Sequence, residues 1–455
     1  MSTDTGRHDV RAVTEGDLGN YLSEMGPSWI AGAVAAGPAT MASVVTAGAT
    51  FGYALLWVVL LSAVLGAAAQ YLAMRLGLFT EAGVVSVVER HLGEGWAWIL
   101  VVDTVLAAGL AQLVIMKGLA DVSATVTGVD ARVWGVAWAV ILALGLAGRG
   151  YRFVELLAKL LVSAVVLAFL ASLVVVPVDP ASAASGLVPR IPAGVDGALV
   201  AAGVLGGAVH VTLITMHSYT MRAREWTSRE YGLATFDVGA SMLAAFGVYS
   251  LAIFLVAAGV LHSPEIEAGD LTAVAAAQAL GPLVGPNAKW LFLLGLWGAA
   301  VSTLGGNTIV PPYLLADKLG WATDVSDARY RALLVAVALL SGLGAFLGGA
   351  FFPLLVLVLA FGLVGTPFAI AVVLYLLNSD AVPEPNSLPA NLGGVVLLAV
   401  TTTLAANFVR TRALPDLGDP LPTFVAAFAA VLGVATLVLV GKYVRETVGG
   451  RAAAA

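Results

Sequence analysis

Residues 203–218 read GVLGGAVHVTLITMHS, an apolar run that fills most of the length of a membrane-spanning helix. The double glycine Gly206-Gly207 and then His210 interrupt this run near its middle. A histidine at membrane depth is rare and usually faces the interior of a helix bundle. The stretch predicts a spanning helix that is broken at its midpoint, although a neutral imidazole bonded to a backbone carbonyl would also fit there.

A second interruption lies near the start of the chain. Residues 26–41 read GPSWIAGAVAAGPATM, with the pair Gly37-Pro38 at the middle of the first apolar stretch. Proline removes a backbone donor and crowds the preceding turn, and glycine relaxes the backbone next to it. A simple kink would explain this pair alone. Two breaks at corresponding places in the two halves of a chain instead point to the substrate site of a transporter.

The composition makes the bilayer the main solvent of the chain. Of 455 residues, 60% are hydrophobic and 11% are charged, whereas a soluble domain averages about 25% charged residues. These values exclude an ordinary cytosolic enzyme and any disordered or fibrous class. The absence of cysteine excludes disulfides and thiolate metal ligands, and a scattered net charge of −6 gives no reason to expect a nucleic-acid partner.

Apolar stretches long enough to cross a membrane recur along the whole chain. We expect an all-α polytopic membrane protein with about twelve transmembrane helices, at residues 27–50, 53–77, 96–119, 132–148, 152–176, 196–222, 232–261, 288–314, 329–348, 352–377, 389–408 and 421–442. Most Lys and Arg residues of the connecting segments then fall on the side of the two termini. This bias predicts a multi-pass protein of the plasma membrane with both termini in the cytoplasm.

The expected organisation has four parts. A cytoplasmic segment at 1–25 precedes a transporter core at 26–380, which holds helices 1–10. Two additional transmembrane helices follow at 381–442, and a short cytoplasmic tail occupies 443–455. The polar residues 1–20 contain no apolar run of the kind found in a signal peptide.

Several motifs stand out between roughly 25 and 380, namely 48–61 (GATFGYALLWVVLL), 70–77 (QYLAMRLG), Tyr151 to Glu155, Gly203 and Gly206, His217-Ser218, Asp237, Ser302-Thr303, 367–369 (PFA) and 378–380 (NSD). In these motifs the chain resembles a known family, the Nramp divalent-metal transporters. The resemblance implies a five-plus-five inverted repeat with helices 1 and 6 broken. It also implies transport of a divalent cation such as manganese or iron, usually with protons.

The resemblance weakens at the positions where the family binds its metal. The first-span signature Asp-Pro-Gly-Asn is Gly37-Pro38-Ala39-Thr40 here, and the sixth-span methionine is His210. The family's third-span carboxylates align with Gly109 and Gln112, and its tenth-span glutamine aligns with Leu359. An imidazole can ligate transition metals, but one imidazole and one hydroxyl without a carboxylate make a sparse set of ligands for a divalent cation.

The candidate residues form two sets. The expected substrate or ion site consists of the residues at the two breaks, with His210 and Thr40 as metal ligands and Gly37, Ala39, Gly207 and Thr212 beside them. A proton or polar path is expected at Asp103, Gln112 and Asn307. Asp103 could also be an ordinary polar residue near a helix end. Asn307 and Thr308 could instead serve only to hold neighbouring helices together through hydrogen bonds.

We therefore expect a secondary transporter that moves a divalent metal cation by alternating access, with no cofactor other than the transported ion. The alternative is a transporter of the same fold for an amino acid or another small organic solute, because the acidic metal ligand is missing. A non-transporting sensor is disfavoured by the short tail, and a passive channel by the lack of a repeated filter motif. We expect no enzyme, because no nucleophile with its base and no His-Glu-x-x-His motif occurs. The sequence leaves the oligomeric state open.

Overall fold

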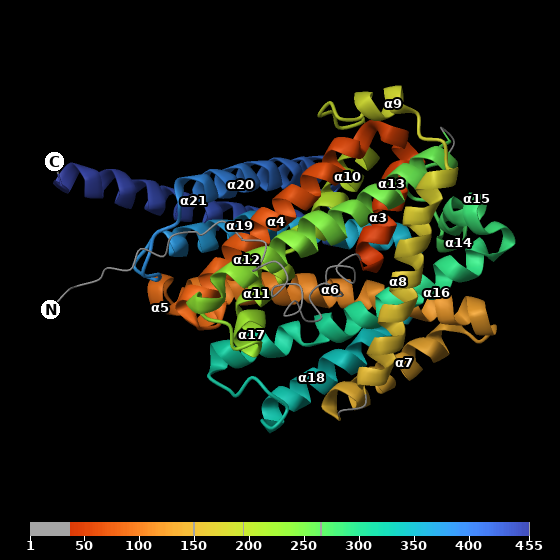
Figure 1. Cartoon of the computed structure of the whole chain (residues 1–455). Helices are drawn as coiled ribbons and strands as arrows, with labels where there is room; N and C mark the ends of the chain where they lie inside the picture. Colours follow the sequence, from red (N-terminus) through yellow and green to blue (C-terminus); the bar gives the residue numbers. More distant parts are fainter. Residues whose placement is uncertain (1–36, 149–150, 194, 264–265, 455) are drawn as a thin grey trace.

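The computed structural model describes residues 37–454 except 149–150, 194 and 264–265, and these residues form helices and no strand (Figure 1). The expected segment 1–25 and the first part of the first span lie outside the described residues. The main helices are α3 (Pro38–Phe51), α4 (Leu56–Thr80), α5 (Val84–Leu92), α6 (Glu94–Thr127), α7 (Ala131–Ala147), α8 (Tyr151–Val175), α9 (Pro180–Ser185), α10 (Val195–Ala208), α11 (Val211–Ala223), α12 (Tyr231–Gly239), α13 (Val248–Val260), α14 (Ala273–Ala277), α15 (Gly281–Val284), α16 (Ala288–Thr308), α17 (Val310–Leu319), α18 (Ala328–Ser341), α19 (Phe351–Leu377), α20 (Leu388–Phe408) and α21 (Pro420–Ala454).

Short helical turns join several of these helices. A π-helix at Ala240–Gly247 (η3) links α12 to α13, and a second one at Val409–Ala413 (η7) extends α20. The remaining turns are 3₁₀ helices, namely η1 (Gly52–Leu55), η2 (Ser228–Glu230), η4 (Gln278–Leu280), η5 (Gly285–Asn287), η6 (Gly342–Phe346) and η8 (Leu414–Asp416).

The spanning helices agree with the sequence expectation. Within the described part of the chain, 10 helical stretches are long and apolar enough to cross a membrane. One of them, Pro38–Thr80, holds the described part of the first expected span together with the second, because η1 joins α3 to α4 directly. The fourth expected span is the shorter apolar helix Ala131–Ala147. Within the described residues, each expected span therefore coincides with an apolar helix.

The last helix continues beyond the expected twelfth span. Helix α21 runs to Ala454, so residues 443–454 of the expected tail prolong the last spanning helix. The residues that follow the apolar stretch include Arg, Glu and Ala, which are good helix formers and let the helix run on.

Helix α19 is the centre of the bundle. It packs against α3, α6, α10, α20 and α21, and almost all of its length is buried. The last two helices, α20 and α21, lie on one flank of the bundle (blue in Figure 1) and expose large apolar side chains such as Leu421 and Leu437. An exposed apolar surface of this kind suits contact with lipid tails.

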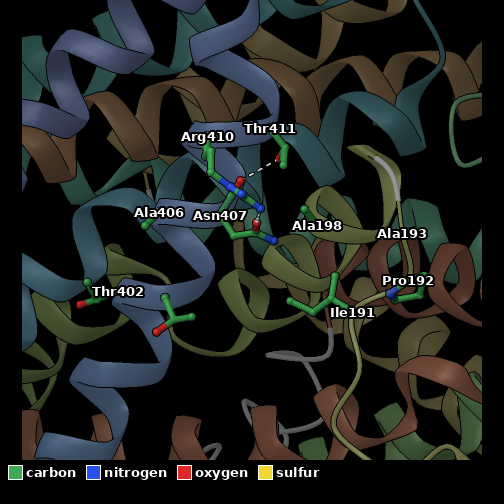
Figure 2. Close-up of a pocket in the computed structure, with 10 residues that line it drawn as sticks. Ile191, Pro192, Ala193, Ala198, Thr402, Ala406, Asn407, Arg410 and Thr411 are labelled. Atoms are coloured by element: carbon green, nitrogen blue, oxygen red, sulfur yellow. Dashed lines mark hydrogen bonds between the residues drawn. The ribbon is translucent and has the colours of Figure 1, made fainter.

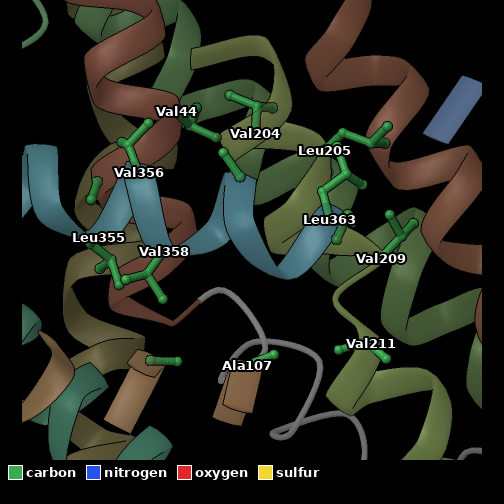
Figure 3. Packing of buried hydrophobic residues seen from close by; sticks show 14 of the residues in the cluster. Val44, Ala107, Val204, Leu205, Val209, Val211, Leu355, Val356, Val358 and Leu363 are labelled. Atoms are coloured by element: carbon green, nitrogen blue, oxygen red, sulfur yellow. The ribbon is translucent and has the colours of Figure 1, made fainter. Parts of the chain in front are cut away.

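Glycines bring α10 into backbone contact with α19. A Cβ added at Gly206 would lie 2.3 Å from the carbonyl oxygen of Leu359, and one at Gly203 would lie 2.8 Å from Cγ1 of Val356. Only small residues let two membrane helices approach this closely. Apolar side chains of α3, α10 and α19, among them Val44, Val204 and Val356, fill the space beside this contact (Figure 3).

Candidate functional site

The sixth span is broken at Val209 and His210, between the end of α10 and the start of α11. The backbone of His210 is extended, with φ −55° and ψ 138°, and its side chain caps α11. Its Nδ1 lies 2.8 Å from the hydroxyl of Thr212 and 3.4 Å from the backbone nitrogen of the same residue. Val209 and His210 therefore separate two helices, and the second helix begins with a side-chain cap. The sequence predicted a break of the spanning helix at this place.

The other ring nitrogen of His210 points at α19. A Cβ added at Gly362 would lie 2.0 Å from Nε2, so only a glycine there leaves room for the imidazole. The side chain of His210 is buried, and its Nε2 has no hydrogen-bond partner among the described residues. In the capping arrangement Nδ1 accepts from the Thr212 nitrogen and the ring hydrogen is on Nε2. In the other tautomer Nδ1 gives up this 3.4 Å bond and donates to the Thr212 hydroxyl, and Nε2 then presents a lone pair to a ligand.

The first span meets this break through Thr40 and Ser43 on α3. A Cβ added at Gly207 would lie 4.0 Å from Oγ1 of Thr40, 4.0 Å from Oγ of Ser43 and 3.9 Å from Cδ1 of Leu359. Thr40 is almost completely buried. The structure thus brings Thr40 and Gly207 together at the contact of α3, α10 and α19.

The end of α10 leaves carbonyl oxygens available at this place, whereas the Gly37 carbonyl at the start of α3 already accepts a helical hydrogen bond. Helix α10 stops one residue after Gly207, so its last carbonyls have no following helical N–H to bind. Gly37 is the N-cap of α3, and its carbonyl accepts the first helical hydrogen bond from the Met41 nitrogen, at 3.1 Å. Pro38 occupies the first helical position, where its missing N–H costs nothing. Ala39 follows as a small, partly exposed residue.

The structure places Thr212 directly beside His210. Its hydroxyl lies against Nδ1 of His210, so it orients the imidazole of that residue. A helix cap sets this contact, because the side chain two residues after His210 folds back onto the start of α11.

The three residues expected on a polar path divide into two places. Asn307 on α16 donates to the side-chain oxygen of Gln112 at 3.0 Å and to the Ala108 carbonyl at 2.8 Å. Gln112 in turn donates to the hydroxyl of Thr308 at 2.6 Å. These contacts tie α6 to α16. Asp103 lies apart from them, more than two turns earlier on α6.

Asp103 faces α19 one turn away from His210. A Cβ added at Gly365 would lie 2.1 Å from Oδ1 and 2.2 Å from Oδ2 of Asp103. The side chain is 1% exposed, and Oδ2 has no hydrogen-bond partner within the described part of the chain. Sequence reasoning missed Gly362 and Gly365, and the only signal for them was the spacing of two glycines three residues apart in an apolar helix.

Two cavities help to locate the site in the bundle. One, of about 960 Å³, lies between residues 191–193 with Ala198 and the end of α20 with η7, where Thr402, Asn407 and Arg410 line it (Figure 2). Of the broken helices it touches only α10, through Ala198 near the end of that helix opposite to the break. A smaller cavity of about 250 Å³ lies where α3, α10 and α19 meet at one end of the bundle, lined by Thr46, Asp196, Val356 and Leu357 among others.

The site contains an unusual donor set. In residues 37–454 without the gaps named above, no group of three or more His, Cys, Asp or Glu side chains is placed to hold a metal ion. Among the described residues, the groups at the break that could hold a cation are the imidazole of His210, hydroxyls and backbone carbonyls.

Comparisons with known proteins agree with this architecture. The family model described as "Natural resistance-associated macrophage protein-like", Nramp, matches residues 28–411. The "Divalent metal cation transporter MntH" of Deinococcus radiodurans is 30% identical over 308 residues, which are 64% of this chain and 70% of that protein. The protein of the same name from Mycobacterium tuberculosis is 28% identical over 375 residues, which are 79% of this chain and 84% of the relative. A crystal structure of the Eremococcus coleocola manganese transporter, in complex with an aromatic bis-isothiourea compound, superposes with a TM-score of 0.69 at 16% identity over 96% of each chain, which shows the fold.

Proposed function

Because this chain belongs to the Nramp family, which its match over residues 28–411 shows, we propose that it is a secondary transporter that carries a divalent metal cation by alternating access. The relatives described above are named as divalent metal cation transporters, which supports this substrate class. The single observation that carries the proposal is the buried, unpartnered Nε2 of His210 at the break of the sixth span.

His210 is the principal ligand in this proposal. Its Nδ1 is engaged by Thr212, so the ring is oriented and Nε2 is left for the cation. A histidine that ligates a metal through one ring nitrogen usually donates a hydrogen bond from the N–H of the other to a neighbouring acceptor, which fixes the tautomer. An imidazole suits Fe, Ni, Cu and Zn, whereas Mg, Ca and Mn are better suited to oxygen ligands such as carbonyls and water.

The remaining ligands are neutral oxygens. The hydroxyl of Thr40 and the carbonyls of Gly37 and Gly207 complete the set, and small Ala39 leaves space beside them. A divalent cation that loses water without meeting a carboxylate pays a large desolvation cost. We therefore expect the cation to keep part of its hydration shell at this site. With Gly109 and Gln112 at the positions of the family's third-span acids, proton coupling is absent or uses other groups.

The route to the site follows α3. Thr40, Ser43 and Thr46 recur at a spacing of three residues, so the cavity at Thr46 lies along the same helix face as the site. With both termini in the cytoplasm, as the distribution of Lys and Arg predicts, this cavity opens to the outside. Its lining holds both Asp196 and Arg412 among mainly apolar residues, so the support for a cation comes from the site and not from this cavity.

Uptake by purified protein in proteoliposomes tests the proposal. We expect Mn²⁺ to enter vesicles that contain the wild-type protein, and His210→Ala to lower both the uptake rate and the binding measured by calorimetry. His91→Ala is the matched control, because His91 contacts only the Val87 carbonyl of its own helix, α5, among the described residues. No uptake above that of empty vesicles for Mn²⁺, Fe²⁺, Co²⁺, Zn²⁺ and Mg²⁺, together with no calorimetric binding, would refute a metal ion as the substrate. Uptake of amino acids by the same vesicles would favour an organic solute.

A further inference from the structure

One face of α19 contacts a different part of the translocation region at each turn. Positions 356, 359, 362 and 365 are three residues apart and lie on neighbouring turns of the same face. Val356 lines the smaller cavity and packs on Gly203, and the carbonyl of Leu359 approaches Gly206. The next two positions are glycines, and each of them accommodates a polar side chain from another helix.

Gly362 and Gly365 receive the two ionisable side chains of this face. The imidazole of His210 occupies the space where a Cβ of residue 362 would be, and the carboxylate of Asp103 occupies the corresponding space at residue 365. Three residues advance a helix by about 4.5 Å, so the two groups are about one turn apart along α19. The order from the cavity onward is therefore Thr46, Thr40 with Gly207, His210, and then Asp103.

The environment of Asp103 leaves its carboxylate without compensation. Asp103 is buried, its Oδ2 has no hydrogen-bond partner among the described residues, and no ion pair involves it in that part of the chain. A carboxylate placed at membrane depth without a partner is expensive and marks a functional position. A passing divalent cation would supply the missing positive charge, and carboxylate oxygen is a favourable ligand for hard divalent ions.

We propose that Asp103 is a second cation-binding position, one turn of α19 beyond His210, which receives the ion when it leaves the broken-helix site. The assignment rests on the proposed transport of a divalent cation. The ion would pass from a neutral site at His210 to an anionic one at Asp103, on its way to the end of the bundle where α19 ends at Leu377. The carboxylate thereby replaces, farther along the path, the acidic ligand that Gly37 lacks.

The test separates binding from transfer. Asp103→Asn keeps the size of the side chain and removes its charge, and we expect Mn²⁺ uptake into proteoliposomes to fall by about tenfold or more. The dissociation constant for Mn²⁺ measured by calorimetry should stay within about threefold of wild type, because the site at His210 is intact. His210→Ala should instead weaken the binding itself.

A glycine variant addresses the same carboxylate from the opposite helix. Gly365→Ala places a methyl group on the Asp103 oxygens and should reduce uptake in the same way as Asp103→Asn. Gly109→Ala, on α6, is the matched control, because a Cβ there meets nothing within 4 Å. Size-exclusion profiles and thermal unfolding establish that each variant is folded.

The outcomes distinguish this inference from the transport assignment itself. Wild-type vesicles that take up no divalent cation would refute the proposed function, whatever Asp103 does. Wild-type uptake together with an Asp103→Asn variant of undiminished rate would overturn the second position. An Asp103→Asn variant that binds Mn²⁺ as weakly as His210→Ala would also overturn it, because the two residues would then form a single site.

Discussion

The hydroxyl of Thr366 on α19 donates a 2.9 Å hydrogen bond to the carbonyl of Val209, inside the break of the sixth span. Thr366 is completely buried, and the two residues are 157 positions apart in the chain. A carbonyl freed by a helix break is costly at membrane depth unless a neighbouring helix satisfies it. This contact therefore stabilises the broken conformation and connects it to α19 next to Gly362 and Gly365.

Replacement of Thr366 by valine should destabilise the protein. The variant keeps the shape of the side chain but leaves the Val209 carbonyl unsatisfied, which costs about 1–3 kcal/mol. We expect a lower midpoint of thermal unfolding in detergent. Thr403→Val is the control, because Thr403 is exposed and bonds only a carbonyl of its own helix among the described residues. Equal midpoints for the two variants would contradict the stabilising role of Thr366.

Substitution of Gly206 by alanine should push α10 away from α19. The new methyl group would lie 2.3 Å from the Leu359 carbonyl oxygen, so one helix backbone must move. Overpacking of this kind costs about 1–3 kcal/mol, and it should also reduce transport because the break lies three residues further on. Thermal unfolding and Mn²⁺ uptake measure the two effects. Gly433→Ala has open space around its Cβ and should leave both unchanged or raise stability slightly.

Removal of the Thr212 hydroxyl should weaken cation binding without removing a ligand. In Thr212→Val the imidazole of His210 loses the 2.8 Å contact that orients it. Residues that orient a metal ligand typically contribute about 10–100-fold to affinity. Calorimetry with Mn²⁺ measures this loss. Thr212→Ser retains a hydroxyl and should bind as the wild type does, and a valine variant of unchanged affinity would argue against His210 as a ligand.

Gln112 and Asn307 should be coupled in stability and dispensable for cation affinity. Their 3.0 Å hydrogen bond joins α6 to α16. A double-mutant cycle with Gln112→Ala and Asn307→Ala should give a coupling energy of about 0.6 kcal/mol, the average for such contacts between membrane helices. The Mn²⁺ dissociation constant should not change. A strong loss of affinity in either single variant would instead place the pair on the cation path.

The two breaks illustrate what local sequence could predict. Gly37-Pro38 and the glycines before His210 act on their own backbone, so their effect is visible without knowledge of the fold. The structure confirms the stop of the sixth span at Val209 and His210 and the start of α3 at Pro38. The segment before Gly37 lies outside the described residues, so the first half of that span stays a prediction.

The sequence did not predict which distant residues contact the site residues. Asp103 looked like a polar residue near the end of a helix, and the structure buries it against Gly365, 262 positions later in the chain. Gln112 and Asn307 appeared together with Asp103 as one path, yet their side chains meet each other and leave Asp103 apart. No local spacing encodes which distant helix covers a given face, so these contacts had to come from the packing.

The sequence by itself determined the membrane class, the apolar helices and the positions of the breaks. Each of these follows from transfer of side chains into lipid and from the hydrogen-bond needs of the adjacent backbone, which are properties of short segments. The tertiary structure alone decided that His210 and Asp103 share one face of α19. The two side chains fit there because Gly362 and Gly365 have no Cβ. Which side chains fill the space beside a glycine depends on how helices distant in the chain pack together.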